Sequence, residues 1–539
     1  MGKQRTNAAL MCLILALQTA MFSESSAVPP NIIFILADDL GWADVSFRGD
    51  PQIPTPNLDV LASQGIILNN YYVQPVCAPS RGALMSGLYP IHTGLQHQVP
   101  APGEPWGLPT NLTIMPEYLK NLGYATHMIG KWHLGYYKES YTPTRRGFDS
   151  FYGYLNGGED YYDHTIFWAN ASGLDFWENT TPVRNEWNHY STELFTTKAQ
   201  SLIKRHDPAK PMFLYLSHQA VHCGDYKVEL EAPALAIAHF PYIKDLNRSI
   251  HAGAVYELDK SVGLVMEALN KRGMLSNSIV VFSTDNGGLP WGVEPNSGYN
   301  WPLRGSKETV WEGGVRGAAF VWSPLLSKSG RLSKQLMHIT DWLPTFYSAA
   351  GGNVSTLGNI DGKDMWEALS QDLESPRQEV LINIDPTENT SALIVGRHKV
   401  VLGSFDEGSH DLRMKAPGGS RPVEGLDQMM LSSQTGKVLK DFYNVRQLTV
   451  RPNWRNETVV RCDQYAPRNN FVAASPPYYF DLEHDPCELN NLAASNVTEL
   501  KELIKKIEEY AKGMVPPANQ PLDPRGLPKY NHGLWGPWE

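Results

Sequence analysis

Four short apolar runs, each followed by chemically capable polar residues, constrain the fold of this chain more than any other feature. They read NIIFILADDL, YATHMIGKWH, PMFLYLSHQAVH and SIVVFSTDNGG. Continuous runs rich in β-branched and aromatic residues are typical of strands that are buried on both faces, as in a parallel sheet. Helical patterns lie between them, such as NLDVLASQGIIL at 57–68 and HAGAVYELDKSVGLVMEALNKRG at 251–273. We therefore expect an α/β fold in which helices sandwich a large, mostly parallel sheet.

The polar residues that follow these runs should lie together, because ligands of open α/β sheets bind outside the carboxyl ends of the strands. These residues are Asp38, Asp39, Lys131, His133, His222, Asp285 and Asn286. Each group could instead begin a turn or cap a helix, which is a frequent use of aspartate. That alternative is weaker for all four runs together than for any one of them, so we predict one shared site.

The predicted site combines oxygen ligands with cations. The Asp-Asp pair after the first run and the Asp-Asn pair after the last supply hard oxygen donors, which suit Ca²⁺ or Mg²⁺ better than zinc. The candidate cations are Arg81, Lys131, His133, His222 and Lys307. A metal and several cations around one pocket indicate a tetrahedral anion or its monoester, a phosphate or a sulfate. The net charge of -10 argues against a non-specific nucleic-acid binder, which needs a basic face.

The first residues have the layout of a cleaved secretory signal, with a basic start, an apolar run and then small residues. We place the cleavage near Ala27; an uncleaved anchor is the alternative, but the apolar run is short for a membrane span. Eight Asn-x-Ser/Thr sequons follow, at Asn111, Asn170, Asn179, Asn247, Asn353, Asn389, Asn456 and Asn496. We expect a glycoprotein of the secretory route, lysosomal or extracellular, without a membrane anchor after cleavage.

Of the five cysteines, one lies in the predicted signal, and the simplest expectation for the other four is two disulfides. Cys462 and Cys487 are close in sequence, so we pair them. Cys77 with Cys223 would then be the second pair. The stretch CAPSRGALMSG around Cys77 instead resembles a loop that enters a helix, where free N–H groups favour an anion and Cys77 could act as a nucleophile.

The composition changes after about residue 380. Strand-like segments alternate with turn residues in EVLINIDPTENTSALIVGRHKVVLGSF, and PPYYFDLEHDPCELNNLA predicts a further strand. Five apolar side chains then share one helical face. They are Leu500, Leu503, Ile504, Ile507 and Tyr510. We predict a signal peptide at 1–27, a catalytic domain at 28–380 and a smaller subdomain at 381–539, with an antiparallel sheet, one packed helix and an irregular tail from Val515.

One motif resembles that of a known family. Residues 77–81, CAPSR, match the Cys-x-Pro-Ser-Arg signature of type I sulfatases and continue as GALMSGLYPIHTGLQH. The stretches ADDLGWADV, GKWHLG, PTRRGFDSFYGY, STDNGG and WPLRGSK…WEGGVRG are similar to further blocks of that family. The resemblance covers about residues 30–510 and implies the alkaline-phosphatase-like architecture of that family.

The resemblance also implies the chemistry of the site. It implies that a formylglycine-generating enzyme oxidises Cys77 to Cα-formylglycine in the endoplasmic reticulum, so that this cysteine is not a disulfide partner. It implies one Ca²⁺ ion, held by residue 77 together with four oxygen ligands. These ligands are Asp38, Asp39, Asp285 and Asn286.

The remaining roles come from the same resemblance. Arg81 and His133 would hold the hydrated aldehyde, and His133 would assist elimination of sulfate. Lys131 and Lys307 would neutralise the sulfate oxygens. His222 would protonate the leaving alcohol, a role suited to histidine, and His218 is the alternative four residues earlier.

Within the family, HTGLQHQV, TRRGFD and GGEDYYDH are similar to blocks of arylsulfatase B-type enzymes. This implies removal of the 4-sulfate from N-acetylgalactosamine of dermatan or chondroitin sulfate; a secreted enzyme for small aryl or plant-derived sulfate conjugates is the alternative. The chain departs from that group in its few cysteines, and Cys223 is expected to be a free thiol. A phosphomonoesterase and a binding protein without activity are weaker alternatives, because the cysteine and the oxygen-only ligand set are all present.

Overall fold

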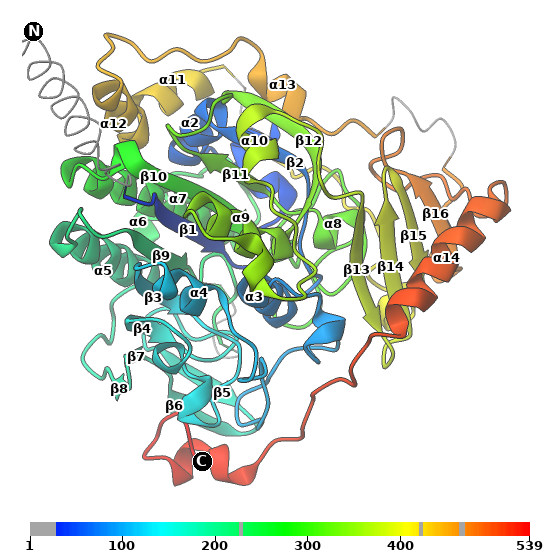
Figure 1. The fold of residues 1–539 in the computed structure, drawn as a ribbon, viewed down its shortest axis with the longest axis horizontal. Helices are drawn as coiled ribbons and strands as arrows, with labels where there is room; N and C mark the ends of the chain where they lie inside the picture. The colour runs from blue at the N-terminus through cyan, green and yellow to red at the C-terminus, as the bar shows by residue number, and fades with distance from the viewer. Residues whose placement is uncertain (1–27, 226–229, 420–423, 463–468) are drawn as a thin grey trace, which may run out of the picture.

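The computed structural model describes residues 28–225, 230–419, 424–462 and 469–539, so the predicted signal peptide lies outside the described residues. A ten-stranded sheet forms the centre, in the order β12-β2-β11-β10-β1-β9-β3-β4-β7-β8 (Figure 1). The four predicted runs are its adjacent, mutually parallel middle strands. They are β10 (Ser278–Thr284), β1 (Asn31–Ala37), β9 (Met212–Ser217) and β3 (Ala125–Lys131). The predicted α/β class and mostly parallel sheet are confirmed.

Six further strands extend the sheet on both sides. They are β2 (Ile66–Tyr72), β4 (Ser150–Tyr154), β7 (Trp177–Glu178), β8 (Thr181–Pro182), β11 (Ala319–Trp322) and β12 (Arg331–His338). Strands β4 and β12 pair in parallel with β3 and β2, whereas β7, β8 and β11 are antiparallel to their neighbours. The antiparallel strands therefore lie outside the four central strands that carry the predicted site.

Both faces of the sheet are covered, which explains why the central strands are apolar throughout rather than in alternation. Ile33 and Ile35 of β1 belong to one buried cluster, and Ile32 and Phe34 belong to the other. The first cluster lies under α2 (Pro56–Gln64), α5 (Ser191–Arg205), α7 (Leu246–Lys271) and α12 (Gln434–Phe442). The second lies under α3 (Cys77–Ser86), α4 (Met115–Asn121), α9 (Trp342–Ala349) and α10 (Trp366–Gln371).

The predicted helix at 251–273 is α7, whereas the predicted helix at 57–68 is only partly correct. Helix α2 ends at Gln64, and Ile66 begins β2, which pairs with β11. Gly65 separates the two elements, and a Cβ atom there would lie 2.3 Å from the carbonyl oxygen of Val321. This close backbone approach allows β2 to join the sheet immediately after the helix.

A second, four-stranded antiparallel sheet follows in the chain, as predicted. Its strands are β13 (Glu379–Asp385), β14 (Thr390–Val395), β15 (His398–Leu402) and β16 (Tyr478–Asp481). Helix α14 (Val497–Ala511) lies across it and buries Leu500, Leu503 and Ile507 (Figure 1). Between β15 and β16 the chain returns to the large sheet, where α11 (Leu426–Ser432) packs on α2 and α12 packs on α7. The domain boundary at residue 380 stays a prediction.

The cysteines resolve the open question of pairing. Cys462 and Cys487 form the predicted disulfide, with their Cα atoms 5.6 Å apart. Cys77 and Cys223 are both free and buried, so a disulfide between them is wrong. Across the described ranges, no helix is long and apolar enough to cross a membrane.

Residues 515–539 form the predicted irregular strap, which runs from α14 to the opposite side of the large sheet (Figure 1). It is anchored on the hairpin of β5 (Thr165–Trp168) and β6 (Ala171–Leu174). Trp535 donates from its backbone N–H to the carbonyl oxygen of Leu174 at 2.9 Å and from its indole Nε1 to that of Ile166 at 3.0 Å. The strap therefore braces a hairpin that lies more than three hundred residues earlier in the chain.

The second sheet is attached to the first through a buried ion cluster. Lys399 of β15 is fully buried, and its Nζ lies 3.0 Å from Glu312 and 2.8 Å from Glu488. Burial raises the pKa of Glu488 to about 7, and the Lys399 charge opposes that rise. Removing the lysine would leave Glu488 buried without its cation, while Glu312 would keep only Arg316 as a cation, at 3.6 Å.

We expect Lys399→Met to lower the free energy of unfolding by about 3–5 kcal/mol, because it leaves a buried charge unpaired. The matched control is Lys506→Met, whose Nζ lies 2.6 Å from the half-buried Glu379 while its own side chain is 43% exposed. This exposed pair should contribute less than about 1 kcal/mol. Denaturant unfolding followed by tryptophan fluorescence measures both, and equal losses would contradict a special role for Lys399.

Candidate active site

The carboxyl ends of the four central strands and the first turn of α3 meet at one point. Cys77 is the first residue of α3 and is 2% exposed. Its Sγ lies 3.6 Å from Oδ1 of Asp38 and 3.7 Å from Oδ1 of Asp39, the two residues that follow β1. The helix N-terminus adds free N–H groups, which favour an anion at the same place.

Three buried cations compensate the carboxylates at this point. Arg81, one turn into α3, places Nη2 2.7 Å from Asp285 and 3.2 Å from Asp38. Lys131, the last residue of β3, places Nζ 2.7 Å from the other oxygen of Asp38. Lys307, on the loop before α8 (Glu312–Val315), places Nζ 2.8 Å from Asp39. Each carboxylate therefore contacts at least one cation.

The oxygen ligands also fit a divalent cation. Oxygens of Asp38 and Asp285 lie within 4.8 Å of each other and of the Cys77 sulfur. Asn286 donates from Nδ2 to Asp39 at 2.7 Å, whereas its Oδ1 is buried without a hydrogen-bond partner within the described part of the chain. A buried amide oxygen without a donor is unfavourable unless it faces a cation. With three carboxylates, this set has the chemistry of a Ca²⁺ or Mg²⁺ site.

The pKa values reflect this crowding. Burial and the Asp38 charge raise the pKa of Asp285 to about 7, and Arg81 opposes the rise. Burial would raise the pKa of Asp39 too, but Lys307 and His222 outweigh it and hold that pKa well below its usual range. The charge of a bound cation would favour the ionised form of Asp285.

Two histidines, His133 and His222, complete this group of residues. Burial, followed by the charges of Lys131 and Arg81, lowers the pKa of His133 well below its usual value. Burial lowers the pKa of His222 to about 4, although Asp39 acts in the opposite direction. The Nε2 atom of His222 lies 3.3 Å from Nζ of Lys307.

The alternative histidine, His218, points away from this site. Its Nε2 lies 3.0 Å from the hydroxyl of Ser261 on α7, beneath the sheet. Only His222 of the two lines the cavity above Cys77. The structure thus brings together the ten residues named as candidates from the sequence; their individual roles stay predictions. They are Asp38, Asp39, Cys77, Arg81, Lys131, His133, His222, Asp285, Asn286 and Lys307.

A cavity of about 190 Å³ lies above Cys77. Its walls come from segment 98–102, strand β5 of the strap-braced hairpin, and the loops at 224–225 and 293–294. Cys77, His133, His222 and Lys307 line its floor. The strand ends therefore supply the polar floor, and loops from distant parts of the chain supply the walls.

Sequence reasoning missed several residues that position this floor. Ser217 follows the third apolar run directly, and its hydroxyl accepts from Nη1 of Arg81 at 2.5 Å. Gly157 and Gly158 lie against the rings of His133 and His222: added Cβ atoms would come within 2.7 Å and 3.2 Å of them. The position of Ser217 at a strand end was a usable signal, whereas the glycine contacts depend on tertiary packing.

One small cavity is surrounded by oxygen ligands, by cations and by a residue placed to act as a nucleophile. This arrangement is that of a hydrolase site for esters of a tetrahedral anion. The sulfatase family model matches residues 30–352. The chain is 39% identical to arylsulfatase J of Mus musculus over 516 residues, which covers 94% of this chain and 80% of that protein. It is 32% identical to N-acetylgalactosamine-6-sulfatase of Homo sapiens over 366 residues, 65% of this chain and 68% of that protein. The chain therefore belongs to the sulfatase family and is a sulfuric ester hydrolase.

A solved structure agrees with this assignment. The crystal structure of Ps i-CgsB in complex with k-i-k-neocarrahexaose superposes with a TM-score of 0.71 at 26% identity, covering 91% of this chain and 94% of that one. Membership of the sulfatase family, predicted from the CAPSR motif, is confirmed. The particular resemblance to arylsulfatase B stays a prediction.

We expect Gly157→Ala to lower kcat/KM for a sulfate ester by about 10–100-fold, because the added Cβ displaces the His133 ring from the cavity floor. Gly418→Ala is the matched control, because a Cβ atom there meets nothing within 4 Å. Sulfate release and the melting temperature should be measured for both proteins. An active Gly157→Ala enzyme would contradict the importance of the His133 position.

Proposed function

We propose that this sulfatase works through Cα-formylglycine derived from Cys77, with one Ca²⁺ ion held beside it by Asp38, Asp39, Asp285 and Asn286. The observation that carries the proposal is the position of Cys77. It is unpaired, buried, at the start of a helix and within 3.7 Å of two carboxylates. Burial raises the pKa of this thiol well above its usual value, so a thiolate nucleophile is not supported.

Formylglycine would supply, in its hydrated form, a nucleophilic oxygen and a second hydroxyl whose deprotonation expels sulfate, while Ca²⁺ would polarise a sulfate oxygen. Lys131, paired with Asp38, and Lys307, paired with Asp39, bind the sulfate oxygens and offset their charge. Arg81 and His133 hold residue 77 in place. A formylglycine-generating enzyme is the partner that this proposal requires during maturation.

His222 is proposed to donate a proton to the leaving alcohol. It lines the cavity floor with Cys77, and its Nε2 lies 3.3 Å from Lys307, so an ester bound over Cys77 would place its bridging oxygen near this ring. Burial disfavours the charged ring in the free protein, but an anionic ester beside it favours protonation. Transfer of this proton means that the alcohol leaves uncharged rather than as an alkoxide.

The proposed substrate is the 4-sulfate of N-acetylgalactosamine in dermatan or chondroitin sulfate, on the strength of the arylsulfatase B-like blocks. One of the relatives is named N-acetylgalactosamine-6-sulfatase, and this name supports a sulfated amino sugar as substrate. A small aryl or plant-derived sulfate conjugate is the second candidate. The small cavity, with Phe167 and Trp168 in its wall, favours that second candidate.

We propose a secretory-route location, either lysosomal or extracellular. Seven of the eight sequon asparagines are exposed, and Asn496 is half-buried. The Cys462–Cys487 disulfide also suits an oxidising compartment. Uptake of the secreted protein into cells that depends on its glycans would indicate the lysosome, and lack of such uptake would indicate the extracellular space.

We expect Cys77 in the protein from eukaryotic secretory cells to carry an aldehyde in place of its thiol. Mass spectrometry of the peptide that contains residue 77 measures this, and Cys223, the other free buried cysteine, is the internal control that keeps its thiol. Cys77→Ala should release no sulfate from 4-methylumbelliferyl sulfate while it remains folded. An unmodified, fully active Cys77 would overturn the formylglycine proposal.

Metal binding and proton donation should be separable by substitution. Asp285→Ala should weaken Ca²⁺ binding about 100-fold or more and lower activity with it, because a charged ligand is lost. His222→Gln should lower activity about 100-fold and leave Ca²⁺ binding intact. Isothermal titration calorimetry with Ca²⁺ measures the first quantity, and unchanged Ca²⁺ affinity in Asp285→Ala would exclude its role as a ligand.

A further inference from the structure

The cavity above Cys77 is acidic beyond its floor. Asp225, Glu294 and Glu308 line it, whereas Lys307 is the one lysine or arginine among its described lining residues. The Nζ atom of Lys307 already lies 2.8 Å from Asp39 at the floor. The two histidines of the lining have lowered pKa values. The walls that would surround the alcohol part of an ester therefore carry negative charge and no free cation.

Glu294 and Glu308 line the cavity next to His222 and Lys307. A carboxylate oxygen of Glu294 lies within 4.8 Å of a ring nitrogen of His222. Glu308 follows Lys307 directly, and its backbone N–H donates to the carbonyl oxygen of Pro75 at 2.7 Å. Within the described ranges, neither side chain forms an ion pair or a side-chain hydrogen bond. Burial raises the pKa of Glu308 to about 7, although the Lys307 charge opposes that rise, so Glu308 adds its full negative charge to the cavity only above that pH.

The same character continues beside the cavity. A smaller adjoining pocket shares Val76, Gln98 and Glu308 with it. Asp385 and Glu388 line this pocket, and its described lining contains no lysine or arginine. Asp385 is paired with His97 at 2.9 Å, so Glu388 is the carboxylate that an anionic chain extending from the site in this direction would meet in the described lining.

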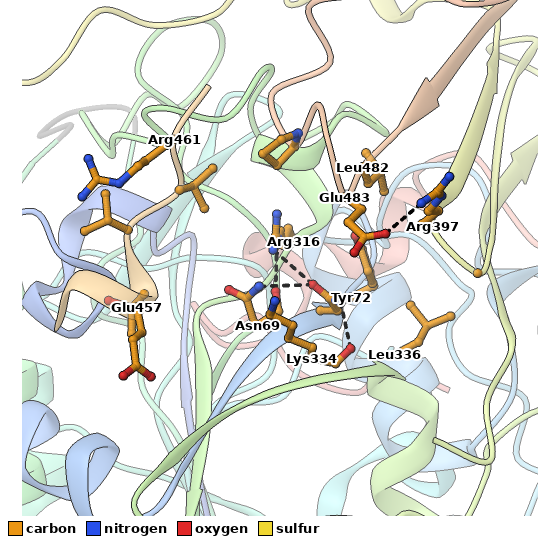
Figure 2. A pocket seen from close by; sticks show the side chains of 16 residues that line it. Asn69, Tyr72, Arg316, Lys334, Leu336, Arg397, Glu457, Arg461, Leu482 and Glu483 are labelled. Carbon is orange, nitrogen blue, oxygen red and sulfur yellow. Dashed lines mark hydrogen bonds and ion pairs between the residues drawn. The ribbon is translucent and has the colours of Figure 1, made fainter. Parts of the chain in front are cut away.

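The cations that a polyanion would need gather elsewhere. A separate cavity of about 540 Å³ is lined by Arg316, Lys334, Arg397 and Arg461 (Figure 2). Glu457 and Glu483 line it too, and Glu483 is paired with Arg397 at 3.0 Å, so cations outnumber carboxylates by four to two in its described lining. Arg461 belongs to the segment after α13 (Trp454–Thr458). This cavity shares no described lining residue with the one above Cys77. The distribution of charge thus separates the basic surface from the reacting centre.

The remaining walls suit an apolar body. Phe167 and Trp168 of β5, Val99 and Pro100 of the 98–102 segment, and Val293 line the cavity. Aromatic and aliphatic walls bury an apolar group favourably, and an unpaired carboxylate beside them disfavours a second anion in the same small space. The sulfate itself is received by the cations and helix N-terminus of the floor.

We propose that Glu294 and Glu308 act as a charge filter, so that the enzyme prefers small sulfate esters whose alcohol part is aromatic or apolar and carries no negative charge. The inference rests on the proposed sulfatase function of this site and narrows its substrate class. It favours the second substrate candidate, the small conjugate, over the glycan 4-sulfate. A sulfated sugar still linked to a uronic acid, like any ester with a carboxylate or a second sulfate next to the reacting group, would bring a further anion against these side chains. The residues act on specificity and take no part in bond making.

Two matched esters test the filter. They are the O-sulfates of 4-hydroxyphenylacetamide and 4-hydroxyphenylacetate. The first carries a neutral amide where the second carries a carboxylate, and their phenolic leaving groups are alike. In the wild-type enzyme, kcat/KM should be about tenfold higher for the amide. This factor corresponds to the repulsion between two like charges near a protein surface. The double variant Glu294→Gln/Glu308→Gln should bring the ratio of the two kcat/KM values towards one.

The control variant is Glu483→Gln, which changes a carboxylate of the cavity in Figure 2 and should keep the wild-type ratio. Raising the salt concentration should increase kcat/KM for the carboxylate ester alone, because salt screens exposed charges. This salt series decides the matter on wild-type protein if the double variant does not fold. A ratio near one in the wild type, or an unchanged ratio in a folded double variant, would overturn the filter. If neither ester released sulfate but N-acetylgalactosamine 4-sulfate did, the filter would be overturned and the sulfatase function kept. If none of the three released sulfate, the proposed function itself would fail.

Discussion

The structure depends on the compensation of charges that are buried at the carboxyl edge of four parallel strands. With Asp285 ionised, as a bound cation would favour, Asp38, Asp39 and Asp285 carry three negative charges there, and Arg81, Lys131 and Lys307 carry three positive ones. Removing any one partner would leave an unpaired charge in a dry environment, which is costly. Because the protein charges balance, a divalent cation would leave the floor net positive. That balance explains how an acidic protein can hold an anionic ester.

The parts of the fold that the sequence predicted are those with local signals. The four central strands were visible because burial on both faces makes each run continuously apolar, and α14 because one face repeats at helical spacing. The end of α2 at Gln64 was missed because a single glycine, Gly65, is compatible both with a helix that continues and with a helix that ends there. The return of residues 426–442 to the large sheet was also missed. Helices α11 and α12 pack on α2 and α7, and no pattern in the sequence shows which distant helices a segment will contact.

The site shows the same division. The charged residues of its floor follow the apolar runs directly in the sequence. Because the carboxyl ends of parallel strands meet at one edge of a sheet, the sequence predicts that Asp38, Lys131 and Asp285 lie together. The walls could not be predicted in this way. Glu294 and Glu308 lie in loops whose residues look like solvated surface in sequence, and only the fold places them over Cys77.

The strap has a consequence for how such an enzyme can diversify. One wall of the cavity is a hairpin that Trp535 holds by two hydrogen bonds, whereas the floor belongs to strands in the middle of the sheet. Substitutions near the end of the chain can therefore shift that wall without disturbing the balanced charges below it. Natural selection can alter which esters enter while the hydrolytic apparatus is preserved.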